Sequence, residues 1–219
     1  MAKIPSGVGI VEVHKGASHV KLVSAVDDDH LQVGGGRRGV VVGFSRSSRR
    51  RLFDLLHRVK KAVRLQALFV TLTYPSEWSE DWHDWKRDLK VFYGRLDRAF
   101  PVVAMLWRLE FQARGAPHFH LIIFNVPWVS RDWIARNWFE VVGSRDEKHL
   151  RAGTQVVAAR NMGRLMGYVG KYLAKEQWCW ESLEAGRVWG LYGRAKLVFE
   201  VVTVVLGPRR WYAVRRVLR

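Results

Sequence analysis

Residues 104–126 read AMLWRLEFQARGAPHFHLIIFNV, and this stretch decides the predicted fold. Two apolar runs lie on either side of a segment that contains Gly115 and Pro117, residues typical of a hairpin turn. We therefore expect two adjacent antiparallel strands here. Side chains two residues apart in a strand point to the same face, so His118 and His120 share one face of the predicted sheet.

The position of the turn decides which residue lies opposite the histidines. A two-residue turn at Arg114-Gly115 would put Glu110 on the wrong face. A loop centred on Gly115 puts Glu110 opposite His120, whereas a loop centred on Arg114 puts it opposite His118. Both odd-numbered loops bring one carboxylate and two imidazoles to a single face, and a three-residue hairpin with a left-handed glycine is a common way to form one.

Two histidines and one carboxylate, with coordination positions left open, are typical of a catalytic site for a divalent metal ion. Two histidines on a strand, taken alone, are as often surface residues or hydrogen-bonded core residues. The acid across the hairpin makes the metal site the favoured interpretation. Its predicted ligands are Glu110, His118 and His120.

The charge of the chain indicates a polyanionic partner. Among 219 residues, Lys and Arg outnumber Asp and Glu by 37 to 20, which gives a net charge of +17. Nucleic acid is the commonest partner of so basic a protein. An anionic membrane is the alternative, but no basic amphipathic helix dominates the sequence. There is no signal-peptide pattern and no apolar run of about 18 residues, so we expect a cytoplasmic protein with no membrane partner.

Strand and helix patterns alternate from residue 68 onward in the order βαββαβ. A strand over 68–74 precedes a helix from near Ser79, the two hairpin strands, a helix from Ser130 to about Val141, and a strand over 154–158. This order predicts an α+β fold with a central antiparallel sheet of ferredoxin-like type and helices on one face. Residues 1–45 read as short strands and loops, so we expect an N-terminal β-rich extension there and one domain over 46–219.

Several basic and polar residues are candidate DNA contacts. A helix over 45–61 has leucines on one face and arginines over much of the rest. A run of one charge sign is usually a solvated face, but the high net charge makes phosphate contact as reasonable an interpretation. The candidates are Arg46, Arg49, Arg50, Arg51, Arg114, Thr71 and Thr73. A β-prone run over 196–206 precedes a basic tail, which we interpret as a secondary DNA contact.

A second informative stretch covers residues 161–175, NMGRLMGYVGKYLAK, which predicts a helix with three distinct faces. One face carries almost no side chains, and each interior glycine costs about 1 kcal/mol of helix stability, so we expect another backbone to approach closely. Tyr168 and Tyr172 are neighbours at i and i+4 on a polar face that also carries Lys171 and Lys175. On this helix alone, half-buried tyrosines and solvated lysines would be the ordinary interpretation.

Together these stretches resemble the HUH endonuclease superfamily, in the form of the two-tyrosine rolling-circle replication initiators of small phages and plasmids. The PHFH sequence at 117–120 resembles its histidine motif, and YVGKYLAK at 168–175 resembles its tyrosine motif. FVTLTYP at 69–75 resembles its first motif. The three motifs come in the order of the family and the resemblance covers about residues 44–190.

The resemblance implies that the Glu-His-His site holds Mg²⁺ or Mn²⁺ and that a tyrosine attacks single-stranded or hairpin origin DNA. The attack would leave a 5′-phosphotyrosine and a free 3′-OH, which could later be rejoined. Tyr172 and Tyr168 would be the nucleophiles, with Lys171 or Lys175 favouring the phenolate. The sequence shows no Walker A pattern, so a host helicase and polymerase are expected partners. A transposase or relaxase of the same superfamily, or a non-catalytic nucleic-acid-binding module, are the alternatives.

Overall fold

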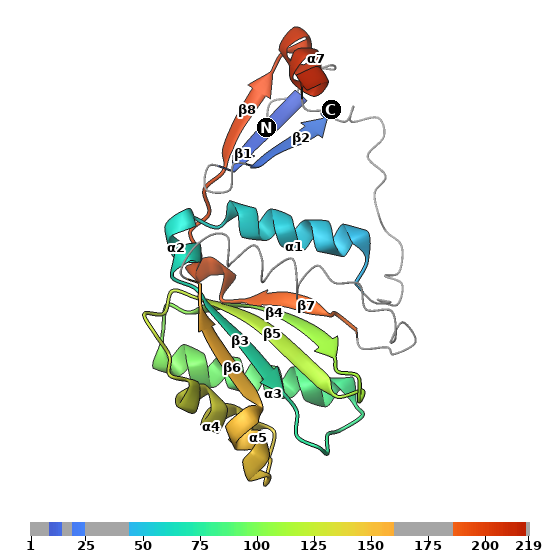
Figure 1. The fold of residues 1–219 in the computed structure, drawn as a ribbon. Helices are drawn as coiled ribbons and strands as arrows, with labels where there is room; N and C mark the ends of the chain where they lie inside the picture. Colours follow the sequence, from blue (N-terminus) through green and yellow to red (C-terminus); the bar gives the residue numbers. More distant parts are fainter. Residues whose placement is uncertain (1–8, 15–18, 25–43, 160–185, 218–219) are drawn as a thin grey trace. The chain divides into compact units, whose positions relative to one another are not determined.

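The structure is a computed structural model that describes residues 9–14, 19–24, 44–159 and 186–217 (Figure 1). The chain divides into two compact units. The large unit comprises Val40–Leu52 and Lys61–Val198, and the small unit comprises Met1–Gly39, Phe53–Lys60 and Phe199–Arg219. The predicted metal ligands lie in the large unit.

The large unit is built on a five-stranded antiparallel sheet in the order β6-β3-β5-β4-β7. Its strands are β3 (Leu68–Thr73), β4 (Ala104–Phe111), β5 (Pro117–Phe124), β6 (Thr154–Ala158) and β7 (Trp189–Tyr192). The first four strands in sequence, with their helices, give the predicted ferredoxin-like βαββαβ order, so the fold prediction is confirmed. The sequence did not predict β7, which extends the sheet beyond β4.

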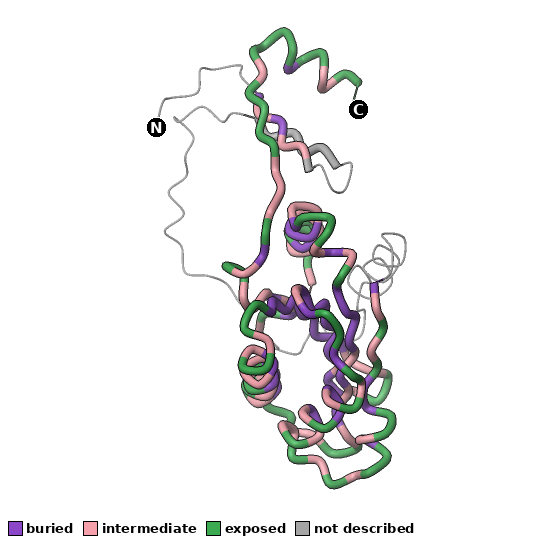
Figure 2. Tube along the Cα trace, turned by 90° about the vertical axis from the view of Figure 1, so that its left-hand side faces the viewer, coloured by how far each residue is buried: buried purple, intermediate pink, exposed green. Residues whose placement is uncertain are grey.

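One face of this sheet packs against α3 (Trp82–Ala99) and α4 (Arg131–Val141), and the buried residues concentrate in the strands and on the inner sides of these helices (Figure 2). Trp85, Leu89, Phe92 and Leu96 of α3 are buried at spacings of three and four, as an amphipathic helix requires. Each fully buried apolar side chain stabilises the fold by about 1.5–3 kcal/mol. These apolar side chains of α3 are therefore part of the core.

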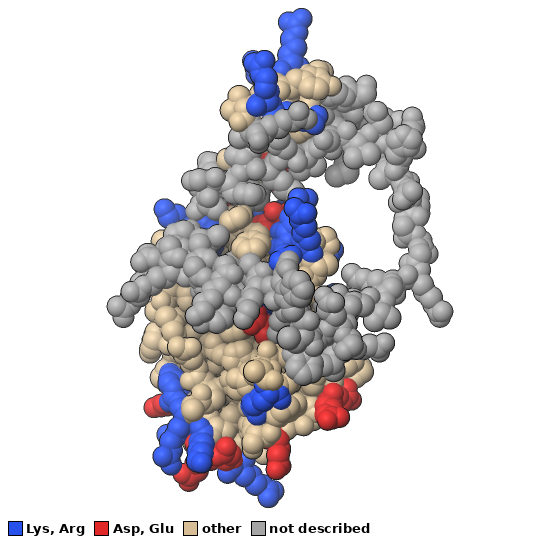
Figure 3. Space-filling view, turned by 45° about the vertical axis from the view of Figure 1, so that its right-hand side comes forward, with Lys and Arg blue, Asp and Glu red and all other residues tan. Residues whose placement is uncertain are grey.

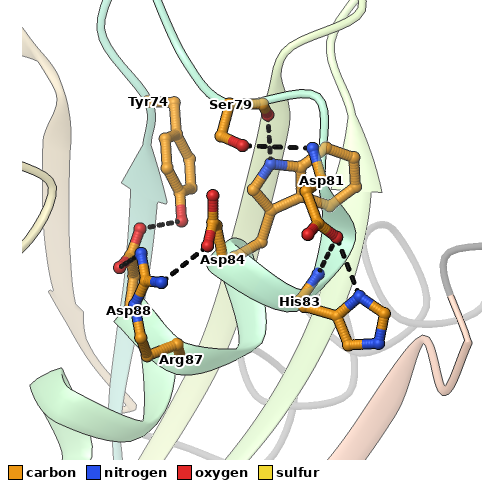
Figure 4. A network of polar contacts seen from close by, with 8 residues as sticks. Tyr74, Ser79, Asp81, His83, Asp84, Arg87 and Asp88 are labelled. Atoms are coloured by element: carbon orange, nitrogen blue, oxygen red, sulfur yellow. Dashed lines mark hydrogen bonds and ion pairs between the residues drawn. The ribbon is translucent and has the colours of Figure 1, made fainter.

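Capping side chains decide where these two helices begin. The predicted start of α3 near Ser79 is wrong by a few residues, because Asp81 is the N-cap and its carboxylate accepts a hydrogen bond from His83 N at 2.8 Å (Figure 4). Nearby, the carbonyl of Ser79 accepts a hydrogen bond from the Trp85 indole at 2.6 Å. The predicted start of α4 at Ser130 is confirmed, because Ser130 is its N-cap.

The helix predicted over 45–61 ends earlier than expected. It is α1 (Arg46–Arg58), and α2 (Lys61–Leu65) and α5 (Glu147–Ala152) are further short helices. The carbonyl of Arg58 accepts a hydrogen bond from Glu200 N at 2.7 Å, and Val59 forms a β-bridge with Phe199. The backbone at Val59 therefore forms a β-bridge, and the helix ends before it because a helical backbone could not form that bridge.

The small unit is a three-stranded antiparallel sheet in the order β2-β1-β8, with a helix, α7 (Pro208–Val217). Strands β1 (Gly9–His14) and β2 (His19–Ser24) confirm short strands in the predicted β-rich N-terminal region, while most of the rest of that region lies outside the described residues. The β-prone run over 196–206 is a strand only in β8 (Val202–Leu206). Because β8 pairs with β1, the basic C-terminal segment groups with the N-terminal strands, unlike the predicted division at residue 45. No helix among the described residues has the length and apolar character needed to span a membrane.

Candidate active site

The hairpin between β4 and β5 has one of the two registers that the sequence left open. Its loop is centred on Arg114, so Glu110 lies opposite His118. Gln112 N donates to the carbonyl of Ala116 at 3.0 Å and closes the loop. Gly115 has a φ of 85°, in the left-handed region where only glycine is free of strain, and this position fixes the turn.

Glu110 uses both carboxylate oxygens. Its Oε1 accepts a hydrogen bond from Arg108 Nη1 at 2.6 Å, and its Oε2 lies 3.2 Å from His120 Nε2. Glu110 is 9% exposed and His120 is 2% exposed, so this contact is largely shielded from water. The predicted acid and one predicted histidine therefore meet directly. Arg108, which the sequence analysis missed, was detectable as the basic residue two positions before the acid on the same strand face.

Two threonines of β3 orient the histidines. Thr73 Oγ1 lies 3.0 Å from His118 Nδ1, and Thr71 Oγ1 lies 3.4 Å from His120 Nδ1. The antiparallel register places each threonine directly opposite its histidine. Both Nδ1 atoms are therefore engaged by threonines, so Nε2 is the nitrogen that each ring could offer to a metal ion, although Nε2 of His120 contacts Glu110 in this structure. Hydrogen-bond partners commonly orient metal-binding histidines in this way. Direct DNA contact by these two threonines stays a prediction.

His118 is held in its neutral form. Burial, with help from the neighbouring His120 and from Arg114, lowers its pKa to about 4, against the opposing effect of Glu110. The rings of His118 and His120 stand edge to face with centroids 4.7 Å apart. Metal ions bind neutral imidazole, so this environment favours the ligating form at neutral pH.

The end of β3 is anchored from the helix side of the sheet. The Thr73 carbonyl accepts hydrogen bonds from Trp138 Nε1 at 2.8 Å and from His149 Nε2 at 2.7 Å. Thr73 N donates to the carbonyl of Gly153 at 2.9 Å. Thr73, which orients His118, is thus held in place by α4 and α5. The sequence gives no signal of this arrangement, because it joins residues of four separate elements, β3, β5, α4 and α5.

One carboxylate and two imidazoles with oriented rings form a donor set of the kind that binds divalent metal ions. Among the residues that the structure describes, however, no group of three His, Cys, Asp or Glu side chains is already placed around a common metal position. The residues present fit the ion by type and burial, and Glu110 already contacts His120, so the metal assignment is a proposal on that basis.

The predicted DNA-binding arginines fall in two places. Arg46, Arg50 and Arg51 are exposed on α1, while Arg49 is half-buried. Arg114 donates to the carbonyls of Tyr74 at 2.6 Å and Pro75 at 2.7 Å, so it joins the hairpin loop to the end of β3. On the face drawn in Figure 3, acidic side chains lie among the basic ones of the large unit. Contact between these arginines and DNA stays a prediction.

The predicted nucleophiles and their lysines lie outside the described residues. Tyr168, Lys171, Tyr172 and Lys175 all fall in the segment 160–185, together with the glycine-lined helix face predicted from the sequence. Their roles therefore stay predictions.

The protein is an α+β protein with a ferredoxin-like sheet. Its candidate active site lies on the sheet face opposite α3 and α4, where an acid and two oriented histidines are found. The sequence pattern of the replication-associated protein ORF2 family matches residues 67–177, half of this chain. The protein belongs to that family. The matched segment begins one residue before β3 and includes both predicted tyrosines.

A curated relative supports this membership. The chain is 27% identical over 203 residues to a replication-associated protein of Pseudomonas phage Pf3, and the match covers 84% of this chain and 69% of the relative. No solved structure matches the chain.

Proposed function

We propose that this protein initiates rolling-circle replication by nicking single-stranded or hairpin origin DNA. The observation that carries the proposal is the direct contact between Glu110 and His120, beside the threonine-oriented His118, in a replication-associated protein. A site of this donor type, in a strongly basic chain, suits the cleavage of a phosphodiester.

Glu110, His118 and His120 would hold Mg²⁺ or Mn²⁺. A bound ion supplies polarisation of the scissile phosphate and neutralises the charge that builds up in the transition state. Thr71 and Thr73 keep the two rings oriented throughout, because a hydroxyl can either donate to Nδ1 or accept from it. The burial of the acid and of His120 excludes water from this contact.

Tyr172 would be the initiating nucleophile. Its phenolate oxygen forms a bond to phosphorus while the bond from phosphorus to the 3′ oxygen of the preceding nucleotide breaks, and that oxygen takes up a proton. One phosphoester bond replaces another, so the reverse step can rejoin the strand without ATP. Tyrosine has an ordinary pKa near 10, and Lys171 or Lys175 would favour the phenolate. Tyr168 would act in a second transfer that terminates or restarts a round.

The free 3′-OH would be extended by a host polymerase, and a host helicase would open the duplex. A transposase or relaxase of the same superfamily is the second candidate, but two tyrosines spaced as YxxxY count against the single-tyrosine transposases. A non-catalytic nucleic-acid-binding module would not need the acid and histidines of the site.

The deciding experiment is cleavage of a single-stranded oligonucleotide from the origin of the parent replicon. We expect nicking and a covalent protein–DNA adduct with Mg²⁺ or Mn²⁺ and none with a chelator. Replacing His118 and His120 together with alanine should abolish nicking and leave salt-sensitive DNA binding largely intact. His83→Ala, a change at an exposed histidine on α3, is the control. Cleavage at the wild-type rate by the double variant would refute the metal assignment.

A further inference from the structure

Arg108 is a permanent charge buried beside the proposed metal ligands. It lies opposite His120 in the hairpin register and is 0% exposed, although arginine is rarely buried unless it is paired. Its Nη1 donates to Glu110 Oε1 at 2.6 Å, and its guanidinium lies 4.3 Å from the centre of the Phe44 ring. Burial, opposed by Glu110 and assisted by the nearby Arg49, lowers the pKa of Arg108, but a guanidinium remains charged in proteins at any ordinary pH.

Because of this contact, the two carboxylate oxygens of Glu110 have different partners. Oε1 is engaged by Arg108, whereas Oε2 faces His120 Nε2 at 3.2 Å. An ion that binds beside His120 therefore meets Oε2, while Arg108 occupies one of the two lone pairs of Oε1 and holds that oxygen toward its own charge. A carboxylate held in this way is expected to be a ligand through one oxygen.

The same contact removes the net charge of the site. Glu110 contributes −1, Arg108 contributes +1, and the two imidazoles contribute none when they are neutral, so these four side chains together offer a divalent ion no net attraction. A phosphate of bound DNA would add negative charge to the site. Ion binding would then be strongest when DNA is in place.

We propose that Arg108 is a positioning residue that competes with the divalent ion for Glu110, limits that carboxylate to one coordinating oxygen, and weakens ion binding to the DNA-free protein. The inference rests on the proposed function, because it assigns a role toward the proposed ion. It also predicts that removal of Arg108 strengthens metal binding. Removal of a residue that only orients a ligand would have the opposite effect, since loss of an orienting partner usually weakens metal affinity by about 10–100-fold.

The test measures Mn²⁺ binding to the full chain without DNA, from the electron paramagnetic resonance signal of free Mn²⁺. Arg108→Met should bind Mn²⁺ about tenfold more tightly than the wild type, because a like charge next to the ion is gone. Arg108→Lys keeps the charge and should bind within about twofold of the wild type. The matched control is Arg95→Met, which removes an arginine paired with Glu140 at 2.5 Å on the helix side of the sheet and should change nothing.

Unchanged or weaker Mn²⁺ binding by folded Arg108→Met would overturn the inference and leave the proposed function standing. If the wild type itself binds no Mn²⁺ and nicks equally well in chelator, the proposed metal site fails, and the inference fails with it. If Arg108→Met does not fold, a crystal structure of the Mn²⁺-loaded wild type decides. One Glu110 oxygen on the metal with Arg108 on the other supports the inference, and two oxygens on the metal refute it.

Discussion

Thr73 Oγ1 lies 3.0 Å from His118 Nδ1, and through this pair the helix side of the sheet controls the orientation of a proposed metal ligand. The carbonyl of the same threonine accepts hydrogen bonds from Trp138 and His149, which come from two different helices. Thr73 thus joins the buried core to the site. Changes on the far side of the sheet are expected to reach His118 through this residue.

Thr73→Val removes the hydroxyl while it keeps the shape of the side chain and the backbone hydrogen bonds. We expect Mn²⁺ affinity and nicking rate to fall by roughly 10–100-fold, because His118 loses its orienting partner. The free energy of unfolding should change by only about 1 kcal/mol. Mn²⁺ titration and nicking assays measure the effect, and Thr203→Val, at an exposed position on β8, is the control. Wild-type metal affinity in Thr73→Val would show that the contact does not orient the ligand.

Gly153→Ala tests the packing behind Thr73. A Cβ at this position would lie 2.4 Å from His149 Cδ2 and 2.6 Å from the His149 carbonyl oxygen, and that oxygen cannot move freely. We expect a loss of about 1–3 kcal/mol in the free energy of unfolding, measured in denaturant. Gly207→Ala is the matched control, because no heavy atom lies within 4 Å of its added Cβ. Equal destabilisation by both substitutions would contradict the packing argument.

Lys86 gives the protein a distinct pH dependence. Its Nζ lies 4.4 Å from the centre of the Trp107 ring, and burial, with the charge of Arg187 second, lowers its pKa from 10.5 to about 7. Between these two values the unfolded chain binds a proton that the folded chain does not, so this group makes stability rise with pH across that window. Lys86→Met should abolish this contribution. A stability difference between the two proteins that stays constant from pH 7 to pH 10 would refute the prediction.

The basic surface of α1 is expected to contact DNA phosphates. Replacing the exposed Arg46 and Arg50 with alanine should flatten the dependence of the logarithm of affinity on the logarithm of salt concentration by roughly 0.7 for each single-strand phosphate that is no longer bound. Fluorescence anisotropy over a salt series measures the slope. The matched control replaces Arg98 and Arg136, which are exposed on α3 and α4. An equal change of this slope in the control variant would mean that α1 contributes no more phosphate contacts than α3 and α4 do.

The two tyrosines are expected to have different roles. Phenylalanine keeps the ring and removes only the oxygen, so Tyr172→Phe should lose the covalent protein–DNA adduct on an origin oligonucleotide. Tyr168→Phe should keep that adduct and fail to release circles after one round. Tyr212→Phe, which changes an exposed tyrosine on α7, should behave as the wild type. Loss of the adduct in Tyr168→Phe alone would reverse the assignment, and equal adduct formation by both variants would make the tyrosines interchangeable.

Local patterns were sufficient for much of the large unit. Apolar runs, turn residues and helical periodicity predicted β3 to β6 and the helices α3 and α4, because these signals lie within each element's own sequence. The turn chemistry narrowed the hairpin to two registers, but only the closing hydrogen bond from Gln112 and the conformation of Gly115 select between them. The acid and the histidines were predicted to share a face, and the structure brings Glu110 and His120 into contact.

Features that depend on contacts between residues far apart in the sequence could not be predicted from the sequence. The end of α1 at Arg58 depends on a bridge to Phe199, which no local signal indicates. The strand β7 is short and finds its place beside β4 only once the sheet exists. Arg108 looks like a surface residue by type, yet it is 0% exposed and packs against Phe44, which is distant in the sequence.

The pairing of β1 with β8 has a consequence for synthesis on the ribosome. The five strands of the main sheet leave the exit tunnel in one continuous stretch, so that sheet can assemble while translation continues. Strands β1 and β2 precede this stretch, whereas β8, their third strand, follows all of it in the sequence. We therefore expect the main sheet to form before the sheet in which β8 pairs with β1, and a ribosome stalled before β8 emerges to carry an N-terminal hairpin that lacks its third strand.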